Sequence, residues 1–295
     1  MNQWHIVTAG HLSRNKFWGE DEYSSNHPVL ATSTIIQSDA GNILVDPSMN
    51  AKEMQKAVYD SCGLKPEEIN IIYSTHFHND HWMGVEGFPN AEFYMAKEDL
   101  LSLLLLRDCV EEEARRVLDR VKPADGELVE GFQLIPLPGH TKGLQGLLFD
   151  APEGKVLVCG DSVMGYEFFQ AKQGYFYSYS LEQCVESIQK ASEIADIIVP
   201  GHGNYFSAKA YPFHEMPEEK PDETYSGIPV NGTYSIETTI GEILSREDGM
   251  QLFEENLIKD FPMTALKMSA YLPIRVLAKS MGLKKEELEK FIMKM

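Results

Sequence analysis

Short apolar and β-branched runs alternate with polar, glycine-containing segments through the first two hundred residues, a pattern typical of buried strands. The turn at residues 39–41 joins two of these runs and predicts a β-hairpin. Strands are predicted at residues 5–9, 31–37, 42–45, 69–73, 132–137, 155–161 and 197–202. Because helical patterns lie between several of these runs, the sequence indicates a layered α/β fold.

The helical patterns have identifiable ends. Residues 51–62 predict a helix that ends at Gly63. Residues 181–194 predict another, which begins with a capping box made by Ser180 and Gln183. Residues 97–121 predict a leucine-rich helical pair whose first helix needs burial on more than one side. We expect this insertion to pack on the main fold, with an oligomer or acyl-chain surface as the alternative.

The segment Ser-Thr-His-Phe-His-Asn-Asp-His, residues 74–81, directly follows the strand predicted at 69–73. Imidazole nitrogen and carboxylate oxygen are ligands that first-row divalent metals prefer. His76 and His78 are two residues apart, so an extended backbone sends both side chains to one side. Asp80 and His81 follow, where a tight turn can aim them at a second point nearby. The segment therefore predicts a metal site.

Three further candidate ligands stand downstream, each at the C-terminal end of a predicted strand. They are His140, Asp161 and His202. Each lies beside a glycine, which lets the backbone approach a site closely. Since layered α/β folds gather their sites at such strand ends, we expect these residues to join the cluster at 76–81.

This set of residues, in this order, resembles the metallo-β-lactamase superfamily of metallohydrolases. The match covers the His-x-His-x-Asp-His signature and the later His, Asp and His, over roughly residues 30 to 205. The resemblance implies a four-layer αββα sandwich. It implies that His76, His78 and His140 hold one metal ion, that Asp80, His81 and His202 hold a second, and that Asp161 bridges the two. It also places Asp46 beside the site without ligating a metal, with a turn residue before proline as the alternative.

The resemblance implies a chemistry as well. A water shared by two zinc-like cations loses its proton near neutral pH, and the hydroxide attacks a substrate carbonyl. Asp80 is the catalytic residue that would carry a proton to the leaving group. Two ions of zinc are expected, and iron or manganese accept the same ligands.

Three classes of reaction fit this chemistry. The favoured one is hydrolysis of a small ester or lactone, as in the acyl-homoserine lactonases that the chain is similar to. Those lactonases place a tyrosine three residues after the bridging aspartate, where this chain has Met164, so Tyr166 and Tyr205 are candidates to replace it. The alternatives are a thioester hydrolase similar to glyoxalase II and an iron-dependent redox enzyme similar to persulfide dioxygenases.

Seven aromatic residues lie close together between positions 166 and 179, just after Asp161. A loop that leaves the strand of the bridging ligand should pass over or beside the metals. Its aromatic rings would then form one wall of the substrate pocket, and an aromatic wall suits an apolar or aromatic substrate. The predicted pocket residues are Tyr166, Phe168, Phe169, Phe176 and Tyr205. The alternative is that the rings fill core beneath the loop.

The composition limits the binding partners and the cellular compartment that we expect for this protein. The formal net charge of −19 argues against a nucleic-acid surface, which needs clustered Lys and Arg. The four cysteines lack disulfide or metal spacing, and no export signal or membrane-spanning run is visible, so a cytoplasmic enzyme is expected. Its predicted partner is a small-molecule substrate, and a homodimer through the helical insertion or the C-terminal module is a further expectation.

The composition changes from about residue 213. Residues 1–214 are predicted to form the catalytic domain, 215–234 a proline-containing acidic linker or arm, and 235–295 a small helical module. Thr239 and Glu242 predict a capping box at the start of this module. About 60 residues bury little core alone, so we expect the module to dock on the main domain or on a partner subunit.

Overall fold

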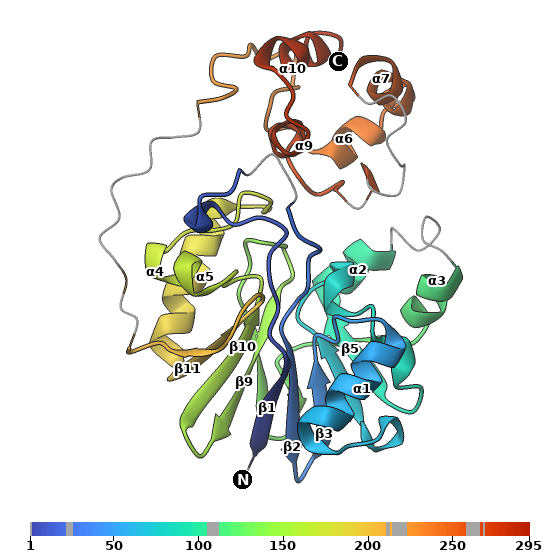
Figure 1. Ribbon diagram of the computed structural model, residues 1–295. Coiled ribbons are helices and arrows are strands. Elements are labelled where there is room, and N and C mark those ends of the chain that lie inside the picture. Colours follow the sequence, from blue (N-terminus) through green and yellow to red (C-terminus); the bar gives the residue numbers. More distant parts are fainter. Residues whose placement is uncertain are drawn as a thin grey trace.

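Two six-stranded β-sheets face one another in the part of the chain that the computed structural model describes, residues 2–21, 26–104, 112–210, 213, 223–257, 266–267 and 269–295 (Figure 1). The first sheet has the order β1 (Gln3–Thr8), β2 (Ser33–Ser38), β3 (Gly41–Val45), β4 (Ile71–Ser74), β5 (Glu92–Ala96) and β6 (Val121–Ala124). The second has the order β12 (Phe206–Ser207), β11 (Ile197–Pro200), β10 (Gly154–Gly160), β9 (Gln145–Ala151), β8 (Phe132–Pro136) and β7 (Glu127–Val129).

The central strands are apolar on both faces, because each sheet packs against the other sheet on one side and against helices on the other. On β4, Ile71 and Tyr73 point to the space between the two sheets, while Ile72 points to the helices outside. Strands β3 to β6 run parallel, and β10 pairs in parallel with β11. Strands that are buried on both faces appear in sequence as continuous apolar runs, which is why they could be located without alternation.

Helices form the outer layers and confirm the predicted αββα sandwich. Figure 1 shows α1 (Ala51–Cys62), α2 (Lys97–Leu104) and α3 (Glu112–Leu118) on one side of the paired sheets, and α4 (Tyr166–Ala171) and α5 (Leu181–Ile194) on the other. The bounds predicted for α1 and α5 are confirmed. Short 3₁₀ turns lie at Lys16–Trp18, Pro66–Glu68, Asn79–His81 and Val85–Gly87.

The leucine-rich insertion packs on the sandwich over its described part. Leu103 of α2 is buried in the core that packs on the first sheet, Leu100 is also buried, and Leu101 is 57% exposed. The rest of the predicted helical pair between α2 and α3, residues 105–111, lies outside the described residues.

The aromatic segment after Asp161 is partly helical, which corrects the prediction of a loop. Its first residues form α4, and this helix turns Phe168 and Phe169 inward, where each is 1% exposed. Phe169 packs against Phe206 and Phe213, with ring centroids 5.0 and 5.1 Å away. Both rings therefore belong to the core beneath the segment.

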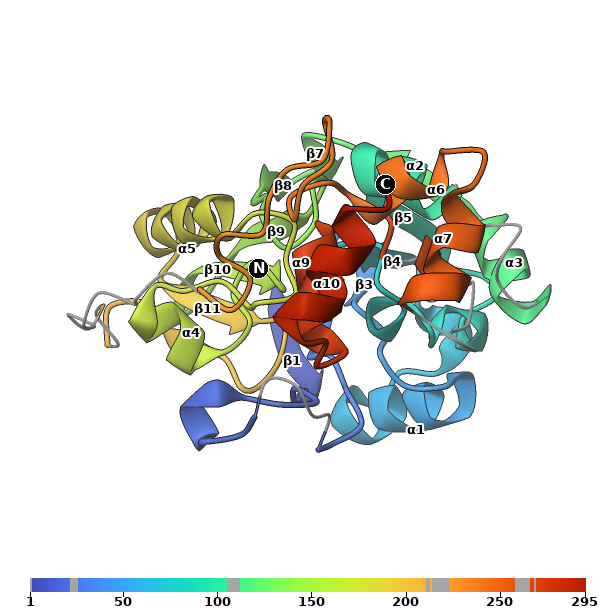
Figure 2. The same ribbon diagram turned by 90° about the horizontal axis from the view of Figure 1, so that it is seen from above.

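The C-terminal helices form a module with a core of its own. These helices are α6 (Ile240–Leu244), α7 (Gly249–Asn256), α9 (Ile274–Ser280) and α10 (Lys285–Ile292). The capping box of Thr239 and Glu242 is confirmed. Figures 1 and 2 place the module on one end of the sandwich, with α9 and α10 above its middle. Residues 215–222 of the predicted linker lie outside the described residues, so the domain boundaries stay predictions.

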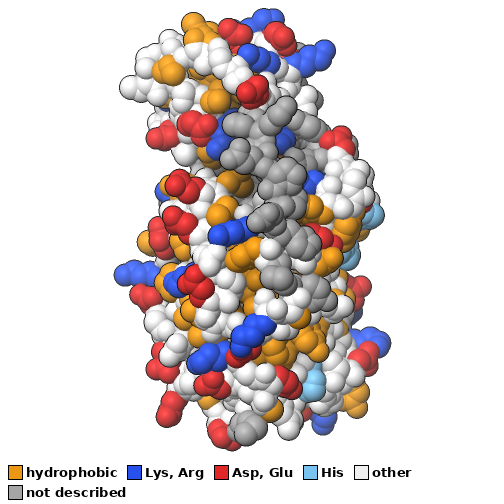
Figure 3. All heavy atoms as spheres, turned by 90° about the vertical axis from the view of Figure 1, so that its left-hand side faces the viewer, with side chains coloured by type: hydrophobic (Ala, Val, Ile, Leu, Met, Phe, Trp, Pro, Cys, Tyr) orange, Lys and Arg blue, Asp and Glu red, His pale blue; other side chains and the backbone are white. Residues whose placement is uncertain are grey.

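Charged side chains of both signs are interspersed with apolar ones on the face shown in Figure 3. Among the described residues, the helices are too short or too polar to cross a membrane.

Replacing Phe169 with alanine should lower the free energy of unfolding by about 3–5 kcal/mol, because it leaves a cavity in a closed core. Chemical denaturation measures this loss. Tyr166→Ala on the same helix is the matched control, because its ring is 42% exposed and should cost far less. Equal losses in the two variants would show that α4 is oriented differently.

Candidate metal centre

The predicted ligands meet at the end of the sandwich that the C-terminal module covers. The chain leaves β4 into residues 74–81, which carry the first four, and β8, β10 and β11 end just before His140, Asp161 and His202. Two groups have ligand atoms within 4.8 Å of one another: His76, His78, His140 and Asp161 in one, and Asp80, His81 and His202 in the other. The topology thus gathers all seven residues named from the sequence.

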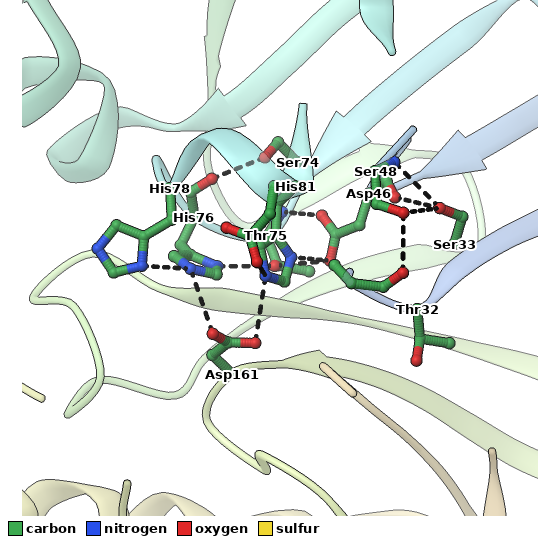
Figure 4. A network of polar contacts seen from close by, with 12 residues as sticks. Thr32, Ser33, Asp46, Ser48, Ser74, Thr75, His76, His78, His81 and Asp161 are labelled. Carbon is green, nitrogen blue, oxygen red and sulfur yellow. Dashed lines mark hydrogen bonds and ion pairs between the residues drawn. The ribbon is translucent and has the colours of Figure 1, made fainter. Parts of the chain in front are cut away.

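Asp161 contacts both groups, and Figure 4 shows it joined to His76 of the first and His81 of the second. Its Oδ2 is 3.2 Å from His140 Nε2 and 3.8 Å from His76 Nε2. Its Oδ1 is 3.2 Å from His81 Nε2 and 3.3 Å from His202 Nε2. Each oxygen therefore serves one group, which is the geometry that a bridging carboxylate needs.

Each of the five imidazole rings has one nitrogen in the cluster and the other hydrogen-bonded outside it. The Asp46 carboxylate and the Leu30 carbonyl can only accept, so His81 Nδ1 (2.9 Å) and His202 Nδ1 (2.8 Å) donate to them. The other three outer nitrogens face hydroxyl oxygens that can accept: His76 Nδ1 faces Thr75 Oγ1 (3.2 Å), His140 Nδ1 faces Ser178 Oγ (3.2 Å) and His78 Nε2 faces Tyr271 Oη (2.7 Å). A neutral imidazole that donates through one nitrogen offers a lone pair at the other. All five inner nitrogens are thus prepared to accept a cation.

The inner atoms lack the partners that buried polar atoms normally have. His81 Nε2 and Asp161 Oδ1 are buried without a hydrogen-bond partner among the described residues. The inner nitrogens of His76 and His140 each lie 3.0 Å from His78 Nδ1. Buried polar atoms left unpaired are costly. A metal ion at each group would satisfy them, so the residues fit two divalent ions.

The charges in the cluster also favour cations. Burial lowers the pKa of His76 and His78 well below the usual value, so both rings are neutral. Burial, the largest single effect, opposes charge on His81 and His202, but the carboxylates of Asp161 and Asp80, with Asp46 also beside His81, together raise the pKa of both rings. Burial alone would raise the pKa of Asp161, yet His81 and His202 hold it well below its usual range. The cluster is therefore built around a buried anion that needs positive charge.

Asp46 accepts a hydrogen bond from the outer nitrogen of His81 and does not belong to either group of candidate ligands. Its carboxylate also accepts from the backbone N–H and the hydroxyl of Thr75, at 2.8 and 2.9 Å. Asp46 has a positive φ of 51°, a conformation that costs energy in a non-glycine residue. The three hydrogen bonds hold it there, so that it orients the strand end that leads to His76.

Glycine at position 201 allows β11 to approach the bridging carboxylate. A Cβ atom there would lie 2.0 Å from Asp161 Oδ1. Gly160 is similar, because a Cβ would lie 2.2 Å from Thr75 Oγ1 and its φ is 53°. Any larger residue at either position would displace the ligand or its support.

Asp99 is a positioning residue that the sequence did not reveal. Its fully buried carboxylate accepts from the backbone N–H groups of Phe77 and Gly143 and from the hydroxyl of Thr141. It thereby ties the segment of His76 and His78 to the turn that carries His140. Burial raises the pKa of Asp99 to about 7, against the effect of these hydrogen bonds. An acid at a helix start gives no sign of such burial.

Tyr271 is the second residue that the sequence did not reveal. It belongs to the C-terminal module, 193 positions from His78 in the chain. Desolvation raises the pKa of Tyr271 well above its usual value, and nearby acids act in the same direction, so its phenol is neutral.

A cavity of about 220 Å³ opens beside the cluster. Its polar side carries candidate ligands, including Asp80, and its apolar side carries Leu12, Val29, Met164, Tyr175 and Tyr177. A neighbouring cavity of about 440 Å³ shares Leu12 and His202 with it.

The predicted pocket residues do not line one cavity; they lie in the neighbouring cavity, in the core and outside both cavities. Tyr166 and Tyr205 line the neighbouring cavity. Phe168 and Phe169 lie in the core, so the structure corrects the prediction for these two. Phe176 lies between the cations of Arg14 and Lys279, at 5.4 and 5.8 Å, and is not among the residues that line either cavity. The clustering of aromatic residues in the sequence predicted a pocket wall, but it did not show which rings would line the pocket.

Known proteins share this sequence pattern and this fold. An N-acyl homoserine lactonase from a Bacillus species is 26% identical to this chain over 181 residues, which cover 60% of this chain and 69% of the relative. An N-acyl homoserine lactonase from Bacillus thuringiensis is 27% identical over 190 residues, which cover 62% of this chain and 74% of the relative. A solved metallo-beta-lactamase-type structure from Thermotoga maritima aligns with a TM-score of 0.53 at 17% identity, covering 70% of this chain and 99% of that one.

A second structure, a mutant of the Bacillus thuringiensis lactonase AiiA with N-decanoyl-L-homoserine at its active site, aligns with a TM-score of 0.51 at 21% identity, covering 68% and 92%. At such identities the structures show a shared fold. A family model described as the metallo-beta-lactamase superfamily matches residues 28–202, more than half of the chain. This protein therefore belongs to the metallo-beta-lactamase superfamily.

Proposed function

We propose that this protein is a binuclear metal-dependent hydrolase that opens the ester bond of a lactone, or cleaves a small ester, with an apolar acyl chain. The observation that carries the proposal is the cluster of seven side chains in which all five imidazoles have their outer nitrogens tied. The matched relatives are lactonases, which supports the same class of bond.

His76, His78 and His140 would hold one ion, Asp80, His81 and His202 the other, and Asp161 would serve both through its two oxygens. Two divalent ions supply a water of lowered pKa as nucleophile and polarise the substrate carbonyl. The protein's own part is to hold the five imidazoles turned with their inner nitrogens toward the ions, through Thr75, Asp46, Ser178, the Leu30 carbonyl and Tyr271.

Asp80 is the acid best placed to move a proton. Its Oδ2 lies 3.7 Å from His81 Nε2 and 4.0 Å from His202 Nε2, and the residue also lines the cavity. A carboxylate there can take a proton from the nucleophile and give it to the departing alkoxide oxygen. Asp80 thus combines ligation with proton transfer.

The apolar side of the cavity supports an acyl chain as part of the substrate. Leu12 and Met164 are 4% and 3% exposed and contribute apolar surface to the same cavity that the ligands line. Met164 occupies the position at which the resembled lactonases have a tyrosine. Tyr175 and Tyr177 are the tyrosines that line this same cavity. Their rings offer further apolar surface for an acyl chain bound in this cavity.

Chelation should abolish hydrolysis of an acyl lactone, and zinc, iron or manganese should restore it. Asp161→Ala should lower activity by several orders of magnitude and release both ions, because it removes one ligand from each group. Lactone hydrolysis measured by proton release, with metal content by elemental analysis, tests this. Asp150→Ala is the control, since its side chain is 82% exposed. Full activity without metal, or faster turnover of thioesters or persulfides than of lactones, would contradict the proposal.

Hydrolysis and metal retention should both fall as the pH drops below about 6. In the metal-free chain Asp161 and the neighbouring carboxylates together raise the pKa of His81 and His202 against the effect of burial, so protons occupy these rings at and below that raised pKa. Protons then compete with metal as the pH falls, and metal affinity rises with pH. Activity and metal affinity measured from pH 5 to 8 check the sign. Affinity that is unchanged or greater at pH 5 would be inconsistent with imidazole ligands.

Tyr175→Ala should reduce kcat/KM for a long-chain acyl lactone roughly tenfold or more, since a buried apolar contact of this size is worth about 1.5–3 kcal/mol. A short-chain lactone should be hardly affected. Phe176→Ala is the matched control, because its ring is adjacent in sequence but lines neither cavity. Kinetics on lactones of increasing acyl-chain length measures the ratio of kcat/KM for the long-chain substrate to that for the short-chain one. An identical ratio in both variants would place the acyl chain elsewhere.

A further inference from the structure

We propose that the helical C-terminal module is part of the metal centre, and that its Tyr271 is a positioning residue for the ligand His78. This inference rests on the proposed function, because it takes His78 as a metal ligand. It assigns the module a role at the site, beyond covering one end of the sandwich.

The first observation is the origin of the five outer partners. Thr75, Asp46, Ser178 and Leu30 belong to the sandwich, and Tyr271 belongs to the module. His78 Nε2 has Tyr271 Oη as its hydrogen-bond partner at 2.7 Å, and the structure offers it no other among the described residues. Without the module, this one ligand would lack the bond that fixes its ring and tautomer.

The second observation is that packing fixes the phenol ring. Tyr271 packs at once against the core under the first sheet and against the core of the module. Its ring stands edge-on to Phe77, with centroids 5.4 Å apart and planes at 84°. It also lies 5.9 Å from the ring of His78. Because both cores hold the ring, its hydroxyl has a defined position rather than that of a mobile surface group.

The third observation is a second contact from the same short segment of the module. Ser269 Oγ lies 2.5 Å from Tyr177 Oη. Tyr177 directly precedes Ser178, which accepts from His140. Residues 269–271 therefore contact the segment that carries His78 and the segment whose Ser178 supports His140. The module is attached where these ligands must be aligned.

The physical role follows from the direction of the hydrogen bond. With His78 Nδ1 facing the cluster, its Nε2–H donates to the phenol oxygen. Such an outer acceptor fixes the ring and raises the basicity of the ligating nitrogen, and its loss typically costs 10–100-fold in metal affinity. Tyr271 does not line the cavity beside the cluster, so it positions a ligand and does not touch substrate.

The test is Tyr271→Phe in the full chain, which keeps the ring and removes only the hydroxyl. Affinity for Zn²⁺ is measured by competition with a chelator, and the visible spectrum of the Co²⁺-loaded protein reports the ligand environment. One of the two ions should bind about 10–100-fold more weakly, and the Co²⁺ spectrum should change. Two ions bound as tightly as in the unmodified chain would overturn the inference.

Tyr225→Phe is the matched control. Tyr225 precedes the module in the chain but is buried in the module's core, and its hydroxyl donates to the Leu283 carbonyl at 2.8 Å, away from the cluster. This variant should lose some stability but keep both metal affinities. Equal weakening of metal binding by both variants would show a general effect of loosening the module and would overturn the specific role of Tyr271.

If Tyr271→Phe does not fold without metal, Tyr271→Gln and Tyr271→Leu decide the matter. The two side chains are similar in size, but the glutamine carbonyl can accept the His78 N–H. Tighter Zn²⁺ binding by the glutamine variant supports the inference, and equal binding overturns it. Failure of the unmodified chain to bind two ions would instead refute the proposed function, so the two failures are distinguishable.

Discussion

Five imidazole rings and two carboxylates share one largely buried volume, and the structure depends on keeping those rings oriented there. A ring whose outer nitrogen were unpaired could turn or change tautomer, and its inner nitrogen would no longer face the cluster. Each outer nitrogen is instead held within 3.2 Å of an acceptor. Asp161 then concentrates negative charge between the two groups, and the site requires cations to balance it.

The sandwich meets this requirement by ending its strands at one edge. Parallel β3 to β6 and parallel β10 and β11 bring their C-terminal ends together, and tight turns there carry the ligands. Close approach of the two sheets' edges depends on Gly160 and Gly201, where a side chain would collide with Thr75 or Asp161. Asp99 links the two turns from the side of α2. The ligand geometry is thus a product of backbone positions far from one another in sequence.

The sequence predicted the ligands and the layers well, because these leave local signals. Buried strands are continuous apolar runs, and α1 and α5 have clear caps at Gly63 and Ser180. It failed where the decisive contact is long-range or depends on direction. Nothing near Asp99 or Tyr271 shows their partners, which lie up to 193 positions away. Phe168 and Phe169 were assigned to a pocket because aromatic density does not show which face of α4 is buried.

Anomalous diffraction from crystals of protein purified without added metal, recorded at the absorption edge of the bound element, would show whether two metal ions occupy the cluster. We expect two peaks about 3.5–4 Å apart, one beside each carboxylate oxygen of Asp161. One peak would lie among His76, His78 and His140, and the other among Asp80, His81 and His202. A single peak, or peaks away from Asp161 in protein that is active, would contradict this expectation.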